Sequence, residues 1–166
     1  MATYSRQIAK KLGYDEDEQD EIYMMGLLHD VGKIGIPDSV INKPGKLTAE
    51  EYEIIKKHPE TGVSILAKTE ELPRMTIGAH WHHERYDGGG YPDGLSGENI
   101  PQEARIIAVA DAYDAMTSSR SYRGILSQDA VREEIEKCKG TQFDPVFADI
   151  MLQIIDEDKE YKLHGQ

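Results

Sequence analysis

Residues 104–117, with the sequence ARIIAVADAYDAMT, place the strongest limit on how this chain can fold. A helix that is apolar on nearly every side is stable only when other elements surround it. The segment nevertheless contains Asp111, and no adjacent residue carries a positive charge to neutralise it. A buried carboxylate without partners is too costly, so we expect Asp111 either to form a pair or to bind a metal ion. Taken alone, Asp111 could also cap a neighbouring helix.

Helical periodicity and capping signals run through the rest of the chain. Asp15 with Glu18 and Thr48 with Glu51 each form a predicted capping box. The expected helices cover residues 3–12, 15–31, 48–57, 59–68, 73–83, 104–117, 128–139 and 145–156. No segment shows the alternation of a strand. The sequence therefore predicts an all-α, compact fold of about seven helices with a glycine-rich loop. We expect one domain over residues 1–166, with a polar tail from about residue 157.

Two local features between the helices carry predictions of their own. Residues 32–47 are rich in Gly and Pro and are expected to lack regular structure. His58 precedes Pro59 and is therefore expected outside helical geometry, with Pro59 at the first position of the next helix.

Composition and charge exclude several classes of function. The net charge of −12 argues against binding to polymeric nucleic acid, whereas a small anionic ligand remains possible if metal ions reverse the local sign. No apolar run approaches ~20 residues, so a membrane span is not expected. The N-terminus does not resemble a signal peptide, and the single cysteine, Cys138, is compatible with the cytoplasm.

Ligands of the kind that bind metals occur at four separate places: His29–Asp30, His58, His82–His83 and Asp111. Each place alone has an ordinary structural interpretation, but four coincidences together favour a metal centre. Imidazole and carboxylate without thiolate indicate iron or manganese. Six donors are too many for one catalytic ion, so we expect two ions, bridged by Asp30 and a hydroxide. Such pairs of ions are a recurrent device for hydrolysing phosphate esters.

Three cations near these positions are candidate phosphate contacts. Lys33 follows Asp30 by three residues and could contact a phosphate or donate a proton to the leaving oxygen. Arg120 and Arg123 follow the apolar helix and could bind a second phosphate. Solvated surface charge is the alternative for all three.

The segment HHERYDGGGYP combines the histidine pair with a glycine-rich turn. Consecutive glycines up to Gly90 permit close backbone approaches that a Cβ would forbid. Tyr91 and Pro92 add an aromatic face and a stiff bend to the loop.

Five segments of the sequence resemble the HD-GYP family, a subgroup of the HD-domain metal-dependent phosphohydrolases. They are HDVGKIGIPD (29–38), KPGKLTAEE (43–51), IKKHPETG (55–62), HHERYDGGGYPDGLSGENIP (82–101) and ARIIAVADAYDAMTSSRSYR (104–123). The resemblance implies a helical fold, a centre of two or three metal ions, and hydrolysis of cyclic di-GMP to pGpG or GMP.

The resemblance also implies roles for individual residues. The metal ligands fall on His29, Asp30, His58, His82, His83 and Asp111. Lys33 falls on the lysine near the scissile phosphate, and Arg120 and Arg123 match positions that can contact the dinucleotide. Gly90, Tyr91 and Pro92 are the GYP signature, whose loop shapes the pocket and is linked to GGDEF-domain partners.

One departure from the family concerns the N-terminus. Members with three metal ions take further ligands from a helix upstream of the segment resembling TYSRQIAKKLG, and this chain begins at that segment. We therefore expect two divalent ions and an incomplete third site. The absence of that helix also suggests a homodimer that covers an exposed wall.

Three functions follow as hypotheses. The leading one is a cyclic di-GMP phosphodiesterase in which a hydroxide held between the two ions attacks a phosphate, with Asp30 and Lys33 as catalytic residues. The alternatives are a signalling module that binds cyclic di-GMP or a GGDEF protein without turnover, and a phosphohydrolase of other nucleotides.

Overall fold

The computed structural model describes residues 1–68, 74–118 and 126–160. The helices in these ranges are α1 (Ala2–Lys11), α2 (Glu16–Leu28), η1 (Val31–Gly35), α3 (Asp38–Ile41), α4 (Ala49–Ile55), α5 (His58–Leu66), α6 (Met75–Trp81), η2 (Gly97–Asn99), α7 (Gln102–Thr117), α8 (Gln128–Cys138) and α9 (Pro145–Glu157), with η marking 3-10 helices. The all-α prediction is confirmed, with nine α-helices in the described ranges instead of about seven. None of the described helices combines the length and hydropathy needed to cross a membrane.

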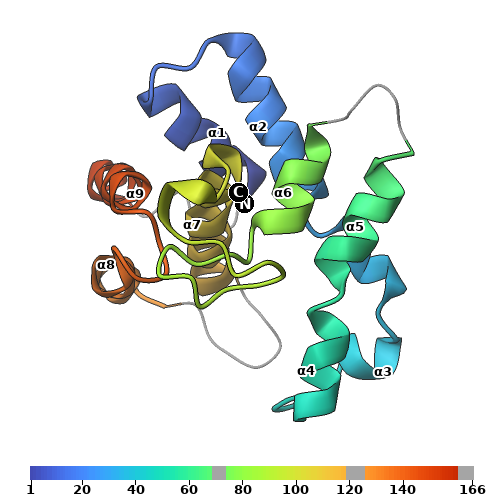
Figure 1. The fold of residues 1–166 in the computed structure, drawn as a ribbon. Coiled ribbons are helices and arrows are strands. Elements are labelled where there is room, and N and C mark those ends of the chain that lie inside the picture. Colours follow the sequence, from blue (N-terminus) through green and yellow to red (C-terminus); the bar gives the residue numbers. More distant parts are fainter. Residues whose placement is uncertain (69–73, 119–125, 161–166) are drawn as a thin grey trace.

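Helix α7 lies at the centre of the molecule, as its apolar sequence predicts. It contacts α1, α2, α6, α8 and α9, and Figure 1 shows it between α8 and α9 on one side and α6 on the other. Seven of its residues are buried, among them Ile106, Ile107 and Tyr113. The rings of Tyr4 and Tyr113 meet edge to face, with their centroids 4.8 Å apart, and this contact joins α1 to α7. Asp111 is therefore fixed to the best-packed element of the fold.

The predicted caps begin three of the helices. Asp15 and Glu18 form a reciprocal capping box at α2, and Thr48 forms another with Glu51 at α4. Asp144 accepts a hydrogen bond from the backbone N–H of Val146 and caps α9. Local hydrogen bonding alone therefore accounts for where these helices start.

The prediction that residues 32–47 lack regular structure is wrong. The chain leaves α2 after Leu28, earlier than the expected residue 31, and forms η1 and then the short helix α3. Gly32 explains why η1 can form against α5, because a Cβ on Gly32 would lie only 1.9 Å from the carbonyl oxygen of His58 and 2.5 Å from the backbone nitrogen of Gly62. This close approach depends on a distant segment, which local propensity does not report.

The prediction that His58 lies outside helical geometry is also wrong. His58 is the first residue of α5, and Pro59 follows it within the first turn. The missing N–H of Pro59 costs nothing there, because the first N–H groups of a helix have no partner within it. The steric bias of the residue before proline is only a preference, and here the packing of α5 against η1 outweighs it.

Candidate metal centre

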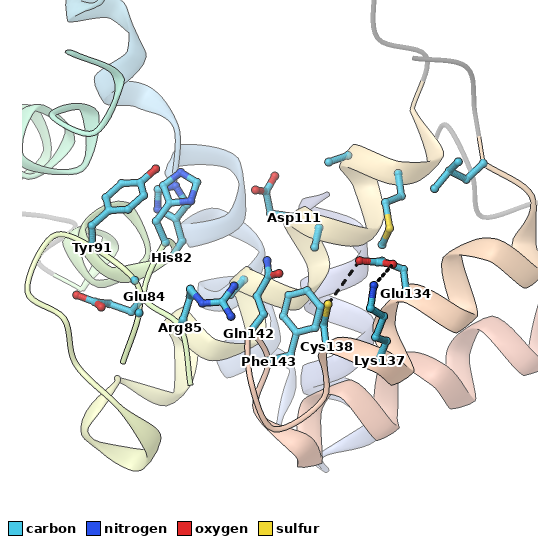
Figure 2. Close-up of a pocket in the computed structure, with 18 of the residues that line it drawn as sticks. His82, Glu84, Arg85, Tyr91, Asp111, Glu134, Lys137, Cys138, Gln142 and Phe143 are labelled. Carbon is cyan, nitrogen blue, oxygen red and sulfur yellow. Dashed lines mark hydrogen bonds and ion pairs between the residues drawn. The ribbon is translucent and has the colours of Figure 1, made fainter. Parts of the chain in front are cut away.

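A cleft of about 1100 Å³ runs between the loop that follows α6, one face of α7, and α8 (Figure 2). Three of the predicted metal ligands, His82, His83 and Asp111, line it. Gly90 and Tyr91 also line the cleft, whereas Pro92 does not.

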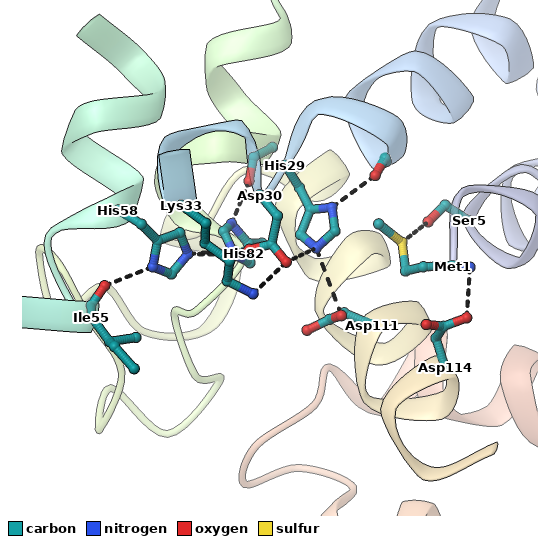
Figure 3. Close-up of polar contacts among 12 residues, drawn as sticks. Met1, Ser5, His29, Asp30, Lys33, Ile55, His58, His82, Asp111 and Asp114 are labelled. Atoms are coloured by element: carbon teal, nitrogen blue, oxygen red, sulfur yellow. Dashed lines mark hydrogen bonds and ion pairs between the residues drawn. The ribbon is translucent and has the colours of Figure 1, made fainter. Parts of the chain in front are cut away.

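All six predicted metal ligands lie together, at the ends of α2 and α6, at the start of α5 and in α7: His29, Asp30, His58, His82, His83 and Asp111. Four of them each place one ligand atom within 4.8 Å of the other three: Asp30, His58, His82 and His83. His29 Nε2 lies 3.2 Å from Asp30 Oδ2 and 3.7 Å from Asp111 Oδ1, which joins the remaining two to the group (Figure 3).

Three of the histidines are oriented in the same way by their own helices. Nδ1 of His29 donates to the carbonyl of Gly26, and Nδ1 of His58 donates to that of Ile55. Nδ1 of His82 donates to the carbonyl of Gly78, one turn earlier in α6. With Nδ1 protonated, the neutral ring carries its lone pair on Nε2, and the three Nε2 atoms face the centre of the group. This is the tautomer and orientation of a metal-binding histidine.

The arrangement of these atoms fits a cation. Nε2 of His58 and Nε2 of His82 are 3.3 Å apart, and since both Nδ1 atoms are donors, the two facing lone pairs repel. Nε2 of His29 and Oδ1 of Asp30 are buried without a hydrogen-bond partner among the described residues. Buried polar atoms are rarely left unsatisfied, and bound divalent metal would satisfy these atoms.

The pKa values of three histidines favour the neutral, ligand form. Burial and the neighbouring His83 lower the pKa of His82 well below its usual range. Burial, aided by His58, lowers the pKa of His83 to about 4. Burial also lowers the pKa of His58. These rings therefore remain unprotonated at neutral pH.

His29 behaves differently because it faces two carboxylates. Burial lowers its pKa, but contacts with Asp111 and Asp30 outweigh burial and raise the pKa to about 9. Burial raises the pKa of Asp30, but His29 and Lys33 reverse this and bring it well below its usual range. Without metal, a protonated His29 thus neutralises the carboxylates.

Lys33 lies beside the ligand group, at the place expected from its spacing. Its ammonium donates a hydrogen bond to Oδ2 of Asp30, and about a third of its side chain is exposed. Lys33 lies beyond the end of α2, and η1 turns it back toward Asp30. A partly exposed cation next to the centre is suited to contact an anionic ligand.

Tyr91 covers one side of the group. Its ring stacks on His83, with the centroids 4.8 Å apart and the planes inclined by 25°. Tyr52 of α4 meets Tyr91 edge to face at 6.5 Å, and Lys56 lies over both tyrosine rings. Burial, together with Tyr52, raises the pKa of Tyr91, so its hydroxyl remains protonated.

The loop that carries Tyr91 is held by two features. A Cβ on Gly90 would lie 2.4 Å from the backbone nitrogen of Arg85 and 2.6 Å from the carbonyl oxygen of His83, so only glycine fits. The buried Glu84 accepts hydrogen bonds from the backbone N–H groups of Asp93 (2.7 Å) and Gly94 (3.0 Å). Glu84 therefore closes the loop onto the end of α6.

Sequence reasoning missed several residues of the site. Glu84, Arg85, Tyr52, Glu134 and Gln142 all line the cleft. Glu84 follows the histidine pair directly, and Tyr52 and Lys56 have the spacing of one helix face. Their positions in the sequence could therefore have indicated a place near the site. Glu134 and Gln142 carried none, because only the packing of α8 brings them to the cleft. Arg120 and Arg123 lie outside the described residues.

Comparison with known proteins gives a consistent family. A family model described as HD domain matches residues 1–146. The chain is 47% identical over 148 residues to the cyclic di-GMP phosphodiesterase response regulator RpfG of Xanthomonas campestris pv. campestris, a match covering 88% of this chain and 39% of that protein. It is 42% identical over 159 residues to the 3'3'-cGAMP-specific phosphodiesterase 2 of Vibrio cholerae, covering 95% of this chain and 30% of that protein. The chain thus spans well under half the length of these relatives.

A solved structure shows the same fold. An HDG"Y"P protein from Bdellovibrio bacteriovorus aligns with a TM-score of 0.74 and 23% identity, covering 93% of this chain and 50% of that one. At this identity the likeness concerns the arrangement of helices.

Proposed function

Because this chain belongs to the HD domain family and carries the HD and GYP motifs of its HD-GYP branch, we propose that it is a metal-dependent phosphodiesterase that hydrolyses cyclic di-GMP to pGpG or GMP. The observation that carries the proposal is the convergence of six nitrogen and oxygen donors beside a cleft large enough for a dinucleotide. The names of the relatives support cyclic dinucleotides as the substrate class.

Two divalent ions fit the donors better than one. Oδ1 of Asp30 faces His58 (3.4 Å) and His82 (3.7 Å), whereas Oδ2 faces His29 (3.2 Å). The carboxylate therefore presents its oxygens to two different sets of ligands, as a bridging ligand does. His58, His82 and His83 would hold one ion and His29 and Asp111 the other, with iron or manganese as the metal. When bound, such ions supply Lewis-acid chemistry to the phosphate and a hydroxide nucleophile near neutral pH.

The residues of the chain perform the remaining tasks. In the metal-free protein, Asp30 is held ionised by His29 and Lys33, so its carboxylate is ready to act as a ligand. Lys33, whose ammonium lies against Asp30, would hydrogen-bond a phosphate oxygen and the departing 3′ oxygen. Tyr91, protonated and oriented by stacking on His83, would donate its hydroxyl to the bound ligand. Arg120 and Arg123 are proposed contacts for the second phosphate.

The test is direct hydrolysis. The full chain is loaded with Fe(II) or Mn(II), its metal content is measured, and it is incubated with cyclic di-GMP while pGpG and GMP are quantified by mass spectrometry. Asp30→Ala should lose both ions and all turnover while its far-UV circular dichroism stays helical. Fully loaded protein that leaves cyclic di-GMP intact contradicts the proposal.

A second candidate substrate has support of its own. The 42% identity to a 3'3'-cGAMP-specific enzyme makes the hybrid dinucleotide a reasonable competitor. Comparing kcat/KM for cyclic di-GMP, 3'3'-cGAMP and linear dinucleotides separates these substrates from a broader nucleotide phosphohydrolase. Tight binding without product would instead indicate a signalling module.

Partners and location complete the proposal. A GGDEF-domain protein at the GYP loop and a homodimer are the proposed protein partners, and the cytoplasm is the proposed compartment, since the sequence contains a single cysteine. Size-exclusion chromatography with light scattering tests the dimer.

A further inference from the structure

We propose that the end of the cleft away from the histidines is a subsite for a guanine base, recognised by Glu134 and Arg85. The inference rests on the proposed cyclic dinucleotide substrate and specifies how one of its bases is selected. The three proposed metal ligands that line the cleft, His82, His83 and Asp111, account for only part of its lining. The opposite end is formed by α8 and the turn that follows it, through Glu134, Lys137, Cys138, Gln142 and Phe143.

The two ends of the cleft are rigidly connected. The backbone N–H of Tyr86 donates to the carbonyl of Gln142 (3.2 Å), and that of Asp87 donates to the carbonyl of Thr141 (2.8 Å). The loop carrying the histidine pair is thus tied to the turn after α8. A ligand that spans the cleft meets a fixed spacing between the metal ligands and the far end.

Arg85 lies between the two ends. It follows His83 by two residues, and Figure 2 shows its guanidinium directed toward Gln142. Asp87 holds the group through Nε (3.0 Å) and Nη2 (2.6 Å). Nη1 has no hydrogen bond to any residue in the described part of the chain, so it can donate to a ligand. An arginine held on one side presents fixed donors on the other.

Glu134 has acceptor capacity to offer. Its Oε1 accepts a weak bond from the thiol of Cys138 at 3.6 Å, and its Oε2 is 3.8 Å from the ammonium of Lys137. The second distance is too long for a hydrogen bond. The carboxylate therefore remains able to accept two strong hydrogen bonds from a ligand.

The wall between these groups is apolar. Ala112 and Met116 of α7, with Phe143, line this part of the cleft. A flat purine ring gains stacking and dispersion contact on such a wall while its edge reaches the polar groups.

The polar groups match guanine and mismatch adenine. Guanine offers N1–H and N2–H donors that a carboxylate accepts side by side, and O6 and N7 acceptors that an arginine satisfies. Adenine places the N1 lone pair where guanine has N1–H, so it would face the carboxylate of Glu134 and repel it. Glu134→Gln replaces one acceptor by an amide donor, which can donate to adenine N1 and leaves one of the guanine N1–H and N2–H groups without an acceptor.

The test is the equilibrium affinity of the Mn(II)-loaded full chain for slowly hydrolysed phosphorothioate analogues of cyclic di-GMP and cyclic di-AMP, measured by isothermal titration calorimetry. Wild-type protein is expected to prefer the guanine ligand, and Glu134→Gln to reduce that preference about tenfold or more. Arg85→Met is expected to weaken binding of the guanine ligand more than binding of the adenine ligand. This variant tests the subsite independently should Glu134→Gln fail to fold.

Glu136→Gln is the matched control, because Glu136 lies on the same helix, pairs with Lys139 and does not line the cleft. It should keep the wild-type preference. An unchanged preference in Glu134→Gln, or no preference for guanine in the wild type, overturns the subsite while leaving hydrolysis of cyclic dinucleotides standing. A wild-type protein that binds neither analogue and hydrolyses neither parent dinucleotide instead defeats the proposed function.

Discussion

At the scale of single residues, the centre depends on which donors carry protons. His58, His82 and His83 have lowered pKa values because they are buried, and so they are ready to bind metal. His29 is the exception, since burial is outweighed by Asp111 and Asp30 and its pKa rises to about 9. A metal ligand must be deprotonated, so in the proposed centre metal and proton would compete for His29.

Metal binding should therefore release about one proton from His29 near pH 7.5, beside any proton that a metal-bound water gives up. Between the unperturbed pKa of about 6.5 and the folded value of about 9, the metal-free protein holds a proton on His29 that the metal displaces. The same proton stabilises the metal-free fold below about pH 6.5, and this contribution is lost as pH rises through about 9. Metal affinity should accordingly rise with pH up to about 9.

The measurement is calorimetric titration with Mn(II) in two buffers of different ionisation enthalpy. The apparent enthalpies should differ by at least about one buffer ionisation enthalpy. In His29→Ala this difference should fall by about one buffer ionisation enthalpy, although affinity also falls. Equal enthalpies in both buffers for the wild type would show that His29 is already neutral.

Glu84 should position the loop that carries Tyr91. Glu84→Ala leaves the N–H groups of Asp93 and Gly94 without their acceptor, and since both contacts are only partly buried, the loss is about 0.5–1.5 kcal/mol for each hydrogen bond. We expect faster hydrogen exchange in residues 85–97 and a raised KM, because Tyr91 is no longer fixed against His83.

Glu84→Gln separates the hydrogen bonds from the charge. Its amide oxygen can accept both N–H groups, so exchange rates and KM should return close to the wild-type values. A loop as mobile in the glutamine variant as in the alanine variant would show that the hydrogen bonds are not what holds it.

At the scale of elements, the contact between η1 and α5 determines the geometry of the centre. Asp30 and Lys33 lie on or beside η1, and His58 begins α5. Gly32 lies between Asp30 and Lys33 in the sequence, and its backbone packs so closely against the backbone of His58 that no side chain fits there. The distance between the carboxylate of Asp30 and the imidazole of His58 is thus set by backbone packing.

Gly32→Ala should disrupt both stability and metal binding. The added methyl group must displace backbone atoms of His58 and Gly62, which costs on the order of 1–3 kcal/mol or more. Thermal denaturation and metal content check the prediction, and both should fall.

Gly35→Ala is the matched control in the same 3-10 helix. Its methyl group would meet only the side chain of Thr61, at 3.2 Å, which can move by a few tenths of an ångström. A similar loss in both variants would mean that helix η1, and not its approach to α5, is sensitive to the change.

At the scale of the whole molecule, an acidic chain is arranged around a cationic cofactor. The net charge is −12, and the ligand group adds Asp30 and Asp111 to a partly buried site. The hydrophobic core around α7 contains none of the six ligands. Metal binding should therefore stabilise the fold without being needed to form it.

Each bound metal ion should raise the melting temperature by about 5–10 °C, so the proposed pair should raise it by up to about twice as much. An ion present at about 100 times its Kd contributes roughly 2.7 kcal/mol, and a domain of this size gains about 2–4 °C per kcal/mol. Differential scanning calorimetry with and without chelator checks the shift, and far-UV circular dichroism should show the helices retained in chelator. Complete unfolding on chelation would contradict the separation of core and site.

The sequence by itself determined the helical class, the starts of three helices and the choice of donor residues that the fold brings together. Capping boxes such as Asp15 with Glu18 act within one turn, so they operate whatever the rest of the chain does. Asp111 in an apolar helix already indicated a carboxylate with a partner or a metal ion, because burial of an unpaired carboxylate is costly in any fold.

Tertiary structure decided what depends on two distant segments at once. Helix η1 forms because Gly32 can pack closely against the backbone of α5. The helical geometry of His58 depends on the same contact between α5 and η1. Glu134 reaches the cleft only because α8 packs beside α7. Sequence periodicity reports which face of a helix is apolar. It does not report which helix will lie against that face or how closely the two backbones approach, and that distance places the ligands of this centre.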